Sequence, residues 1–263
     1  MDLKLSGQLA LVTGSTSGIG KAIAASLLKE GARVIVNSYR QESLDKVREE
    51  MSALGEAYFV KGDVANTESV NKMMDEVYKY GELDILVNNV GFWEGCAFED
   101  ISDEAWLRMF DLNFFCAVRT LRYCFPRMLK RKKGKIINIS SEVAFKPFYG
   151  MIHYDTAKTA LISLSRGLAE QTRGTDVTVN SLLPGPTWTD GEAIFQEEAA
   201  RIANEDLDTH IAKFFKENEP ASIAQRFLLP EEIAFIVTCY CSPLASAPNG
   251  ASIRADGGII RFL

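Results

Sequence analysis

The chain has 263 residues and a formal net charge of −6, with 47% hydrophobic and 24% charged residues. This length and composition fit one large globular domain or two small ones. The acidic balance argues against nucleic acid or an anionic membrane as the main partner, because both select clustered Lys and Arg side chains.

The cysteines show no Cys-x-x-Cys spacing, and only two histidines accompany them, so we expect no metal site. Their odd number and the lack of a signal-peptide pattern predict reduced thiols and a cytoplasmic location. No apolar run approaches the ~18 residues of a membrane span, so no membrane association is expected. The cysteines are Cys96, Cys116, Cys124, Cys239 and Cys241.

The first elements are a short apolar run at residues 9–13, a glycine-rich turn, and a helical pattern at 21–30. Glycines in such a turn let the backbone approach a ligand, and the free N–H groups at the start of the helix favour an anionic diphosphate. A tight βα turn without a ligand is the alternative. The strand and helix on either side favour a dinucleotide-binding loop, formed by Gly14, Ser15, Thr16, Ser17, Gly18, Ile19 and Gly20.

The same alternation of apolar strand and amphipathic helix continues along the chain. Further strands are expected at 33–37, 57–61, 83–88, 135–139, 177–182 and 251–255, and further helices at 42–54, 67–80, 103–131, 153–172 and 230–241. Such a pattern predicts a doubly wound α/β fold with about seven parallel strands, helices on both faces, and a ligand crevice at the carboxyl ends of the strands. No linker or repeat appears, so residues 1–263 are expected to form a single domain.

Residues 190–227 break this alternation. They have mixed charge and a helical pattern rich in Phe and Ala, and no strand is expected among them. We interpret this segment as a lid that covers the substrate end of the crevice.

Tyr154 and Lys158 lie four residues apart at the start of a predicted helix, so their side chains project from neighbouring turns of one face. A free phenol titrates near ~10, and a fixed positive charge beside it favours the ionised form. The pair is therefore expected to lower the pKa of Tyr154 and to allow proton transfer near neutral pH. A solvated Tyr and Lys on a helix surface is the alternative.

Several motifs in register show that the chain resembles the short-chain dehydrogenase/reductase family, whose Rossmann-type domain spans essentially the whole sequence. Members similar to 3-oxoacyl-carrier-protein reductases match the pattern. The motifs are Thr13-Gly14-x-x-x-Gly18-Ile19-Gly20, Asp63-Val64, Asn88-Asn89-Val90-Gly91, Asn113, Ser141, Tyr154, Lys158, Asn180 and Pro184-Gly185.

The resemblance implies a catalytic tetrad of Asn113, Ser141, Tyr154 and Lys158. Tyr154 would exchange a proton with the substrate oxygen, Ser141 would bind the same oxygen, Lys158 would hold the ribose hydroxyls, and Asn113 would hold a water next to Lys158. It also implies a homotetramer or homodimer. Besides the glycine-rich loop, the implied cofactor contacts are Asp63, Val64, Asn89, Val90, Gly91, Tyr154, Lys158, Pro184, Gly185, Thr187 and Thr189.

The choice of cofactor depends on the end of the second strand, residues 36–40. NAD-specific sites normally carry a carboxylate there for the ribose 2′-hydroxyl, and Asn37 lacks that charge. Ser38 and Arg40 could bind a 2′-phosphate, although Arg40 could equally lie on the surface. We therefore expect NADP(H) rather than NAD(H).

The leading hypothesis is an oxidoreductase that interconverts a small-molecule ketone and a secondary alcohol, working reductively with NADPH on an apolar or acyl carbonyl compound. The alternative is a non-catalytic dinucleotide-binding sensor or scaffold on the same fold. His153 is interpreted as packing or surface. Glu94 and Glu142 lie near the crevice and could contact a polar substrate, but we interpret them as solvated surface. An apolar substrate pocket is suggested by a set of aromatic residues that could equally belong to the core, namely Phe92, Trp93, Phe145, Phe148, Tyr149, Trp188 and Phe195.

Overall fold

A parallel sheet of seven strands organises the computed structural model, which describes residues 1–262, and its strand order is β3-β2-β1-β4-β5-β6-β7. The order reverses direction at β1, between β2 and β4, as a doubly wound sheet requires. The sequence prediction of a Rossmann-type fold in one domain is confirmed. The strands are β1 (Leu9–Val12), β2 (Arg33–Ser38), β3 (Ala57–Lys61), β4 (Ile85–Asn88), β5 (Lys133–Ile139), β6 (Asp176–Pro184) and β7 (Ser252–Ala255).

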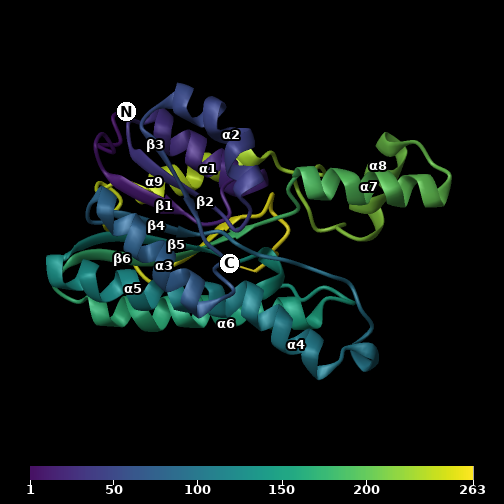
Figure 1. The fold of residues 1–263 in the computed structure, drawn as a ribbon. Helices are drawn as coiled ribbons and strands as arrows, with labels where there is room; N and C mark the ends of the chain where they lie inside the picture. The colour runs from purple at the N-terminus through teal and green to yellow at the C-terminus, as the bar shows by residue number, and fades with distance from the viewer. Residues whose placement is uncertain (263) are drawn as a thin grey trace.

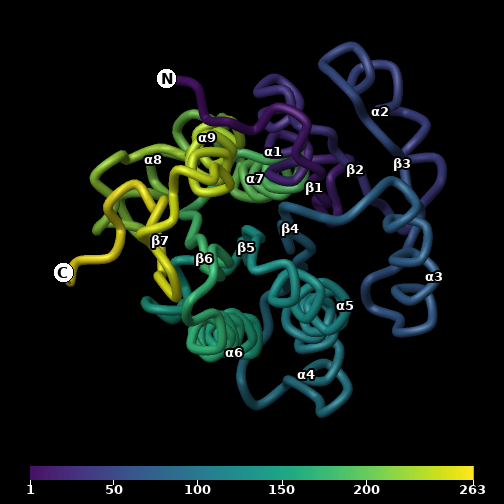
Figure 2. The backbone as a smooth tube through the Cα atoms, turned by 90° about the vertical axis from the view of Figure 1, so that its left-hand side faces the viewer, coloured from purple at the N-terminus to yellow at the C-terminus, as the bar shows by residue number. Residues whose placement is uncertain are grey.

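Helices cover both faces of the sheet (Figures 1 and 2). One hydrophobic core lies between the sheet and α1, α2 and α9, and a second lies between the sheet and α3, α5 and α6. No helix in the part of the chain that is described is long and apolar enough to cross a membrane. The helices are α1 (Gly18–Lys29), α2 (Gln41–Leu54), α3 (Thr67–Val77), α4 (Asp103–Phe110), α5 (Cys116–Arg131), α6 (Ile152–Ala169), α7 (Asp190–Ala203), α8 (Leu207–Glu217) and α9 (Pro230–Cys241).

The central strands β1 and β4 are almost wholly apolar, as expected for strands with both faces buried. Every residue of β1 and of β4 is buried. Parallel pairing aligns Val12 with Val36 and with Val87, so these strands end at one edge of the sheet. The loops that follow them therefore meet there, although they are distant in sequence.

The helix predicted for residues 103–131 is interrupted. A π-helical turn, Asp111–Phe115, separates α4 from α5 and carries the buried Asn113. Wide turns of this kind are frequent at functional sites. The prediction of one continuous helix is wrong at this point, because the Asn113 amide bonds to the backbone of Phe92, outside the helix.

Residues 190–227 form a helical hairpin of α7 and α8 followed by a loop, and the hairpin projects beyond the sheet (Figure 1). Its base is closed by two backbone hydrogen bonds, from the Trp188 N–H to the Leu228 carbonyl and from the Leu228 N–H to the Pro186 carbonyl, each 2.8 Å long. The predicted helical segment without a strand is present, and its action as a lid stays a prediction.

A chain of buried polar side chains links the two central strands to the helices below them. Asn88 Nδ2 donates to Asn138 Oδ1 at 2.8 Å, and Asn138 Nδ2 donates to Ser165 Oγ on α6 at 2.8 Å. Thr120 on α5 donates its hydroxyl to Asn88 Oδ1 at 2.6 Å. Asn88, Asn138, Thr120 and Ser165 are at most 4% exposed, so every group in the chain depends on its neighbours for a hydrogen bond.

We predict that Asn138→Ala lowers the free energy of unfolding by about 2 to 4 kcal/mol, because it leaves Asn88 Nδ2 without its acceptor and Ser165 Oγ without its donor. Urea unfolding at neutral pH measures the change. The exposed Asn71→Ala on α3 is the control and should stay within about 0.5 kcal/mol. Equal stability of the two variants would contradict the prediction.

Candidate active site

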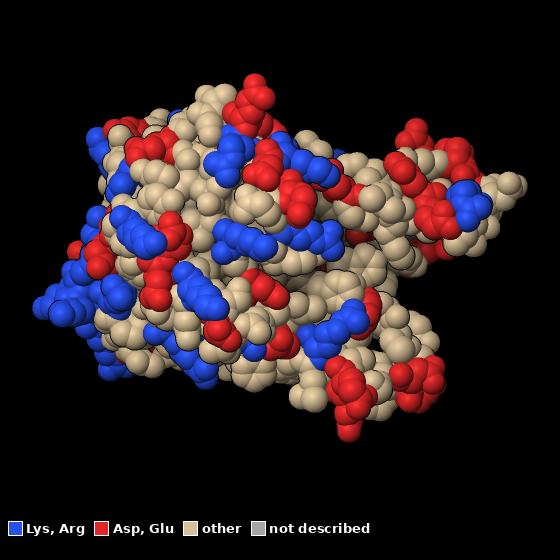
Figure 3. All heavy atoms as spheres, in the orientation of Figure 1, with Lys and Arg blue, Asp and Glu red and all other residues tan. Residues whose placement is uncertain are grey.

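A cleft of about 1050 Å³ lies at the carboxyl ends of the strands. In the space-filling view it opens between the projecting α7 and α8 hairpin on one side and the α4 region on the other, and acidic side chains gather on both rims (Figure 3). The glycine-rich loop, the turn after β4, the end of β5 and the turn after β6 all contribute to its walls. A cleft of this size and depth suits a dinucleotide together with a small substrate.

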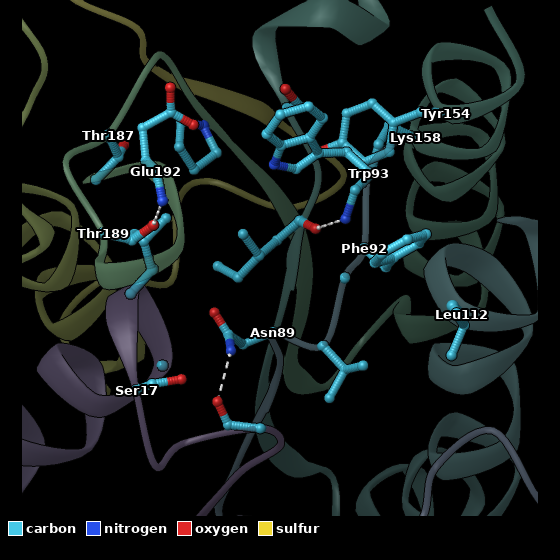
Figure 4. A pocket seen from close by; sticks show the side chains of 18 of the residues that line it. Ser17, Asn89, Phe92, Trp93, Leu112, Tyr154, Lys158, Thr187, Thr189 and Glu192 are labelled. Carbon is cyan, nitrogen blue, oxygen red and sulfur yellow. Dashed lines mark hydrogen bonds between the residues drawn. The ribbon is translucent and has the colours of Figure 1, made fainter. Parts of the chain in front are cut away.

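Gly20 allows the glycine-rich loop to touch the turn that follows β4. A Cβ at Gly20 would lie only 2.4 Å from Asn89 Nδ2 and 2.4 Å from the carbonyl oxygen of Gly14. The Asn89 amide donates to the carbonyls of Thr13 and Gly14, each at 3.1 Å (Figure 4). Asn89 therefore holds the loop in shape with its side chain, and only glycine fits at position 20.

The start of α1 offers the groups that a diphosphate needs. Its first turn contains no acidic residue, and the N-cap Ser17 makes no capping hydrogen bond with its own side chain. Thr16, Ser17, Ile19 and Gly20 line the cleft at this point. Unpaired N–H groups and the positive end of the helix dipole favour bound phosphate, so the residues present fit a dinucleotide.

The end of β2 provides no carboxylate to the cleft. Asn37 is 1% exposed, and its amide nitrogen donates to the carbonyls of Val60 and Gly62, while its oxygen accepts from the Gly14 N–H. Ser38 and Tyr39 follow it along the cleft wall. Arg40 lies just outside, with its guanidinium carbon 4.8 Å from the centre of the Tyr39 ring.

Most of the residues predicted to contact the cofactor line this cleft, and three do not. Ser15 is fully buried, and its hydroxyl donates to the Val12 carbonyl and accepts from the Asn37 N–H, so it stabilises the loop from inside. Gly18 and Arg40 also lie outside the lining. Those that line the cleft are Gly14, Thr16, Ser17, Ile19, Gly20, Asn37, Ser38, Asp63, Val64, Asn89, Val90, Gly91, Tyr154, Lys158, Pro184, Gly185, Thr187 and Thr189.

Ser141, Tyr154 and Lys158 converge at one end of the cleft. Tyr154 and Lys158 come from the first turns of α6, and Figure 4 shows them beside Trp93, across the cleft from Thr189 and Glu192. Lys158 is 2% exposed and its ammonium donates to the Ile139 carbonyl at 3.1 Å. Burial lowers the pKa of Lys158 to about 8.

Burial raises the pKa of Tyr154, and the negative charge of Glu142 raises it further, while the hydrogen bond with Ser141 acts in the opposite direction. The prediction that Lys158 lowers the pKa of Tyr154 is therefore wrong for the protein without its cofactor. The Lys158 ammonium lies 5.6 Å from the centre of the Tyr154 ring and is bonded to the backbone behind it. A phenol in this environment is fully protonated at neutral pH, which suits a proton donor.

Asn113 supports the site from the π-helical turn. Its amide nitrogen donates to the Phe92 carbonyl at 2.8 Å, and its oxygen accepts from the Phe92 N–H at 3.1 Å. A Cβ at Gly91 would lie 2.9 Å from Lys158 Nζ and 3.1 Å from Asn113 Oδ1, so these two side chains meet at that glycine. The water that Asn113 was predicted to hold next to Lys158 stays a prediction.

A sequence model described as short chain dehydrogenase matches residues 8–199. The chain belongs to the short-chain dehydrogenase family. It is 51% identical over its whole length to the uncharacterized oxidoreductase YvrD of Bacillus subtilis, and each chain is covered completely. It is 35% identical to the 3-oxoacyl-[acyl-carrier-protein] reductase FabG of Aquifex aeolicus, over 98% of this chain and 100% of the relative.

Solved structures agree with this assignment. L-sorbose reductase from Gluconobacter frateurii, determined with NADPH and L-sorbose, superposes with a TM-score of 0.94 at 30% identity, and both chains are covered completely. A variant of the actinorhodin polyketide ketoreductase, determined with NADPH, gives a TM-score of 0.90 at 28% identity over 97% of this chain and 98% of the other. This short-chain dehydrogenase is therefore an NAD(P)-dependent oxidoreductase that acts on CH–OH and C=O groups.

Glu142 of this short-chain dehydrogenase was wrongly expected on the solvated surface. It is 7% exposed, it lines the cleft, and its Oε2 accepts a hydrogen bond of 2.6 Å from Ser141 Oγ. Burial raises its pKa to about 7. Its position directly after Ser141 was the available signal, but a side chain at the end of a strand can point into a crevice or away from it, and the sequence does not say which.

The predicted aromatic pocket is partly wrong. Phe92, Trp93, Phe148 and Phe195 line the cleft of the dehydrogenase, whereas Phe145 packs on Phe262, Trp188 packs on Phe227, and Tyr149 is 93% exposed. His153 was interpreted as a packing or a surface residue, and it packs against Trp106. Glu94 pairs with Arg108 at the surface. The sequence analysis did not identify several polar residues of the lining, namely Glu192, Gln196, His210, Asn218 and Glu219.

We predict that Glu142→Gln becomes more stable relative to the native chain as pH rises. The folded pKa of Glu142, about 7, lies above its ordinary value of 4.5, so the native chain loses stability as pH rises through this range, and glutamine does not titrate. Between pH 5 and pH 8 the difference in free energy of unfolding should grow by about 2 to 3 kcal/mol in favour of the variant.

Urea unfolding at several pH values measures this trend. Glu197→Gln, at an exposed position on α7, is the control for the loss of one carboxylate from the chain. A difference for Glu142→Gln that stays constant from pH 5 to pH 8 would show that the buried carboxyl does not titrate there.

Proposed function

We propose that the protein reduces a ketone to a secondary alcohol with NADPH. The observation that carries the proposal is the convergence of Ser141, Tyr154 and Lys158 at the open end of a cleft whose other end fits a dinucleotide. Hydride transfer needs a donor of hydrogen bonds where negative charge develops on the substrate oxygen. Tyr154 would supply one donor, and Ser141 would supply a second once its hydroxyl, which donates to Glu142 Oε2 in this structure, turns to the substrate oxygen.

The roles of the residues follow from their environments. The nicotinamide supplies the hydride when the cofactor is bound. Tyr154 donates its phenolic proton to the developing alkoxide, and its raised pKa keeps that proton in place until the charge appears. Lys158 faces the same end of the cleft and would hold the ribose hydroxyls, while Asn113 keeps the Phe92 backbone in position.

The preference for NADPH is supported by the end of β2. No carboxylate stands there to repel a 2′-phosphate, and Ser38 and Tyr39 line the cleft with Arg40 stacked beside them. The L-sorbose reductase and the polyketide ketoreductase that resemble this chain were both determined with NADPH. The projecting hairpin is proposed as a lid, because Phe195 on α7 makes an edge contact with Trp93, with ring centres 5.0 Å apart.

We predict that Tyr154→Phe lowers the rate of NADPH oxidation with a ketone by roughly 10² to 10⁴, because the proton donor is lost. NADPH affinity, followed by nicotinamide fluorescence, should change less than about threefold. Tyr149→Phe is the matched control, since Tyr149 is 93% exposed in the same loop region and should keep full activity. Turnover that survives Tyr154→Phe would contradict the mechanism, and NADPH binding without any turnover in the native chain would support a sensor instead.

We also predict that Arg40→Ala weakens NADPH binding by about tenfold, equivalent to about 1.4 kcal/mol, and leaves NADH binding unchanged. Fluorescence titration with both nucleotides measures the two affinities. Lys46→Ala removes a positive charge from an exposed position on α2 and is the control for long-range electrostatics. If NADPH and NADH lose affinity equally with Arg40→Ala, the 2′-phosphate is bound elsewhere.

A further inference from the structure

The substrate end of the cleft is acidic and polar on two facing sides. Glu142 lies on one side, after β5, and Glu192 and Gln196 lie on the other, on α7. Glu219 adds a third carboxylate at the end of the hairpin. Aromatic side chains complete the walls, so a substrate here would meet both apolar faces and hydrogen-bonding groups.

Glu142 has acceptor capacity that the protein does not use. Within residues 1–262 the Ser141 hydroxyl is the one side chain that donates to it, at 2.6 Å on Oε2. A carboxylate has two oxygens and about four acceptor positions. Because Ser141 also faces the reacting carbonyl, a hydroxyl on the carbon next to that carbonyl is the substrate group best placed to reach Glu142.

Gln196 presents a second unused acceptor across the cleft. It is 1% exposed, and its Nε2 donates to Glu192 Oε1 at 2.8 Å, while its Oε1 has no hydrogen-bond partner among the residues described. A buried amide oxygen without a donor costs about 1 to 3 kcal/mol, which a bound hydroxyl would recover. Glu142 and Gln196 can therefore each accept a further hydrogen bond from a ligand.

Charge favours the same kind of ligand. Glu219 is 4% exposed and pairs with Lys146. Burial is the main cause of the raised pKa of Glu142, the negative charge of Glu219 adds to it, and the positive charge of Lys146 opposes it. Burial also raises the pKa of Glu192. Because this end of the cleft disfavours the charged form of its own carboxyl groups, it would also disfavour a substrate carboxylate or phosphate, whereas neutral hydroxyl groups carry no such cost.

We infer that the protein selects small α-hydroxy ketones, in which Glu142 accepts a hydrogen bond from the hydroxyl next to the carbonyl and Gln196 accepts one from a hydroxyl further along the chain. This inference rests on the proposed reductase function and replaces the apolar or acyl substrate that the sequence suggested. Glu142 is then a specificity-determining residue as well as the partner of Ser141.

The test compares hydroxyacetone with butanone, which replaces the hydroxyl by a methyl group of similar size. With NADPH, kcat/KM for hydroxyacetone should exceed that for butanone by at least about tenfold, and the preference should lie mainly in KM. Acetoacetyl thioesters of N-acetylcysteamine represent the acyl class and should be turned over more slowly than hydroxyacetone.

Variants separate recognition from the intrinsic reactivity of the two ketones. Glu142→Leu should reduce the ratio of the two kcat/KM values to that of an unselective site, and Glu142→Gln, which keeps the size of the side chain and one acceptor oxygen, should reduce it at least threefold. Gln196→Leu should leave the hydroxyacetone to butanone ratio unchanged and lower the preference for 1,3,4-trihydroxybutan-2-one over hydroxyacetone. Glu197→Leu, exposed on the same helix, is the control.

Binding to the NADP⁺ complex, followed by tryptophan fluorescence because Trp93 lines the cleft, gives a readout that does not need turnover. Selective binding of hydroxyacetone without reduction would support the inference while the proposed reductase function fails. Reduction of butanone or the thioester as efficiently as hydroxyacetone, with a ratio unaffected by Glu142→Leu, would overturn the inference while the reductase function stands. Binding of neither ketone, with no turnover, would overturn both.

Discussion

Parallel pairing of seven buried strands is the constraint on which the rest of the structure depends. Parallel pairing places the carboxyl ends of all strands at the same edge of the sheet. The turns after β1, β4, β5 and β6 therefore meet, although more than 160 residues separate the first from the last. Gly14 and Pro184 line the same cleft for this reason. The cleft is therefore a consequence of topology, and its chemistry comes from the side chains at the strand ends.

Close contact between these turns is what makes the cleft a defined site. Gly20 and Gly91 are positions where a single methyl group would press on Asn89 or on Lys158. Side-chain amides fill the gaps, since Asn37, Asn89 and Asn113 all bond to backbone groups of neighbouring turns. The loops are thereby held in fixed relation before any ligand binds, which lowers the entropy lost on binding.

The catalytic end combines groups that burial affects in opposite directions. Burial raises the pKa of Tyr154 and lowers the pKa of Lys158, because burial favours the uncharged form of each side chain. Glu142 adds a carboxyl with a raised pKa that is bonded to Ser141. Under the proposed function, this arrangement links the hydroxyl that would bind the substrate oxygen to a carboxyl group that would bind a hydroxyl on the next carbon of the substrate.

The sequence by itself determined the strands, the order of the elements and the glycine-rich loop, because each depends on local periodicity or on spacing within one turn, while the tetrad came from the resemblance to the family. The sequence could not determine that Asn37 and Ser15 point inward or that Asn113 bonds to the Phe92 backbone, since those contacts depend on the backbone groups that other turns present. The acidic substrate end was decided by tertiary structure alone. Nothing in the sequence shows that Glu142, Gln196 and Glu219 are buried, and only the tertiary structure brings the turn after β5, α7 and the segment after α8 to one cleft.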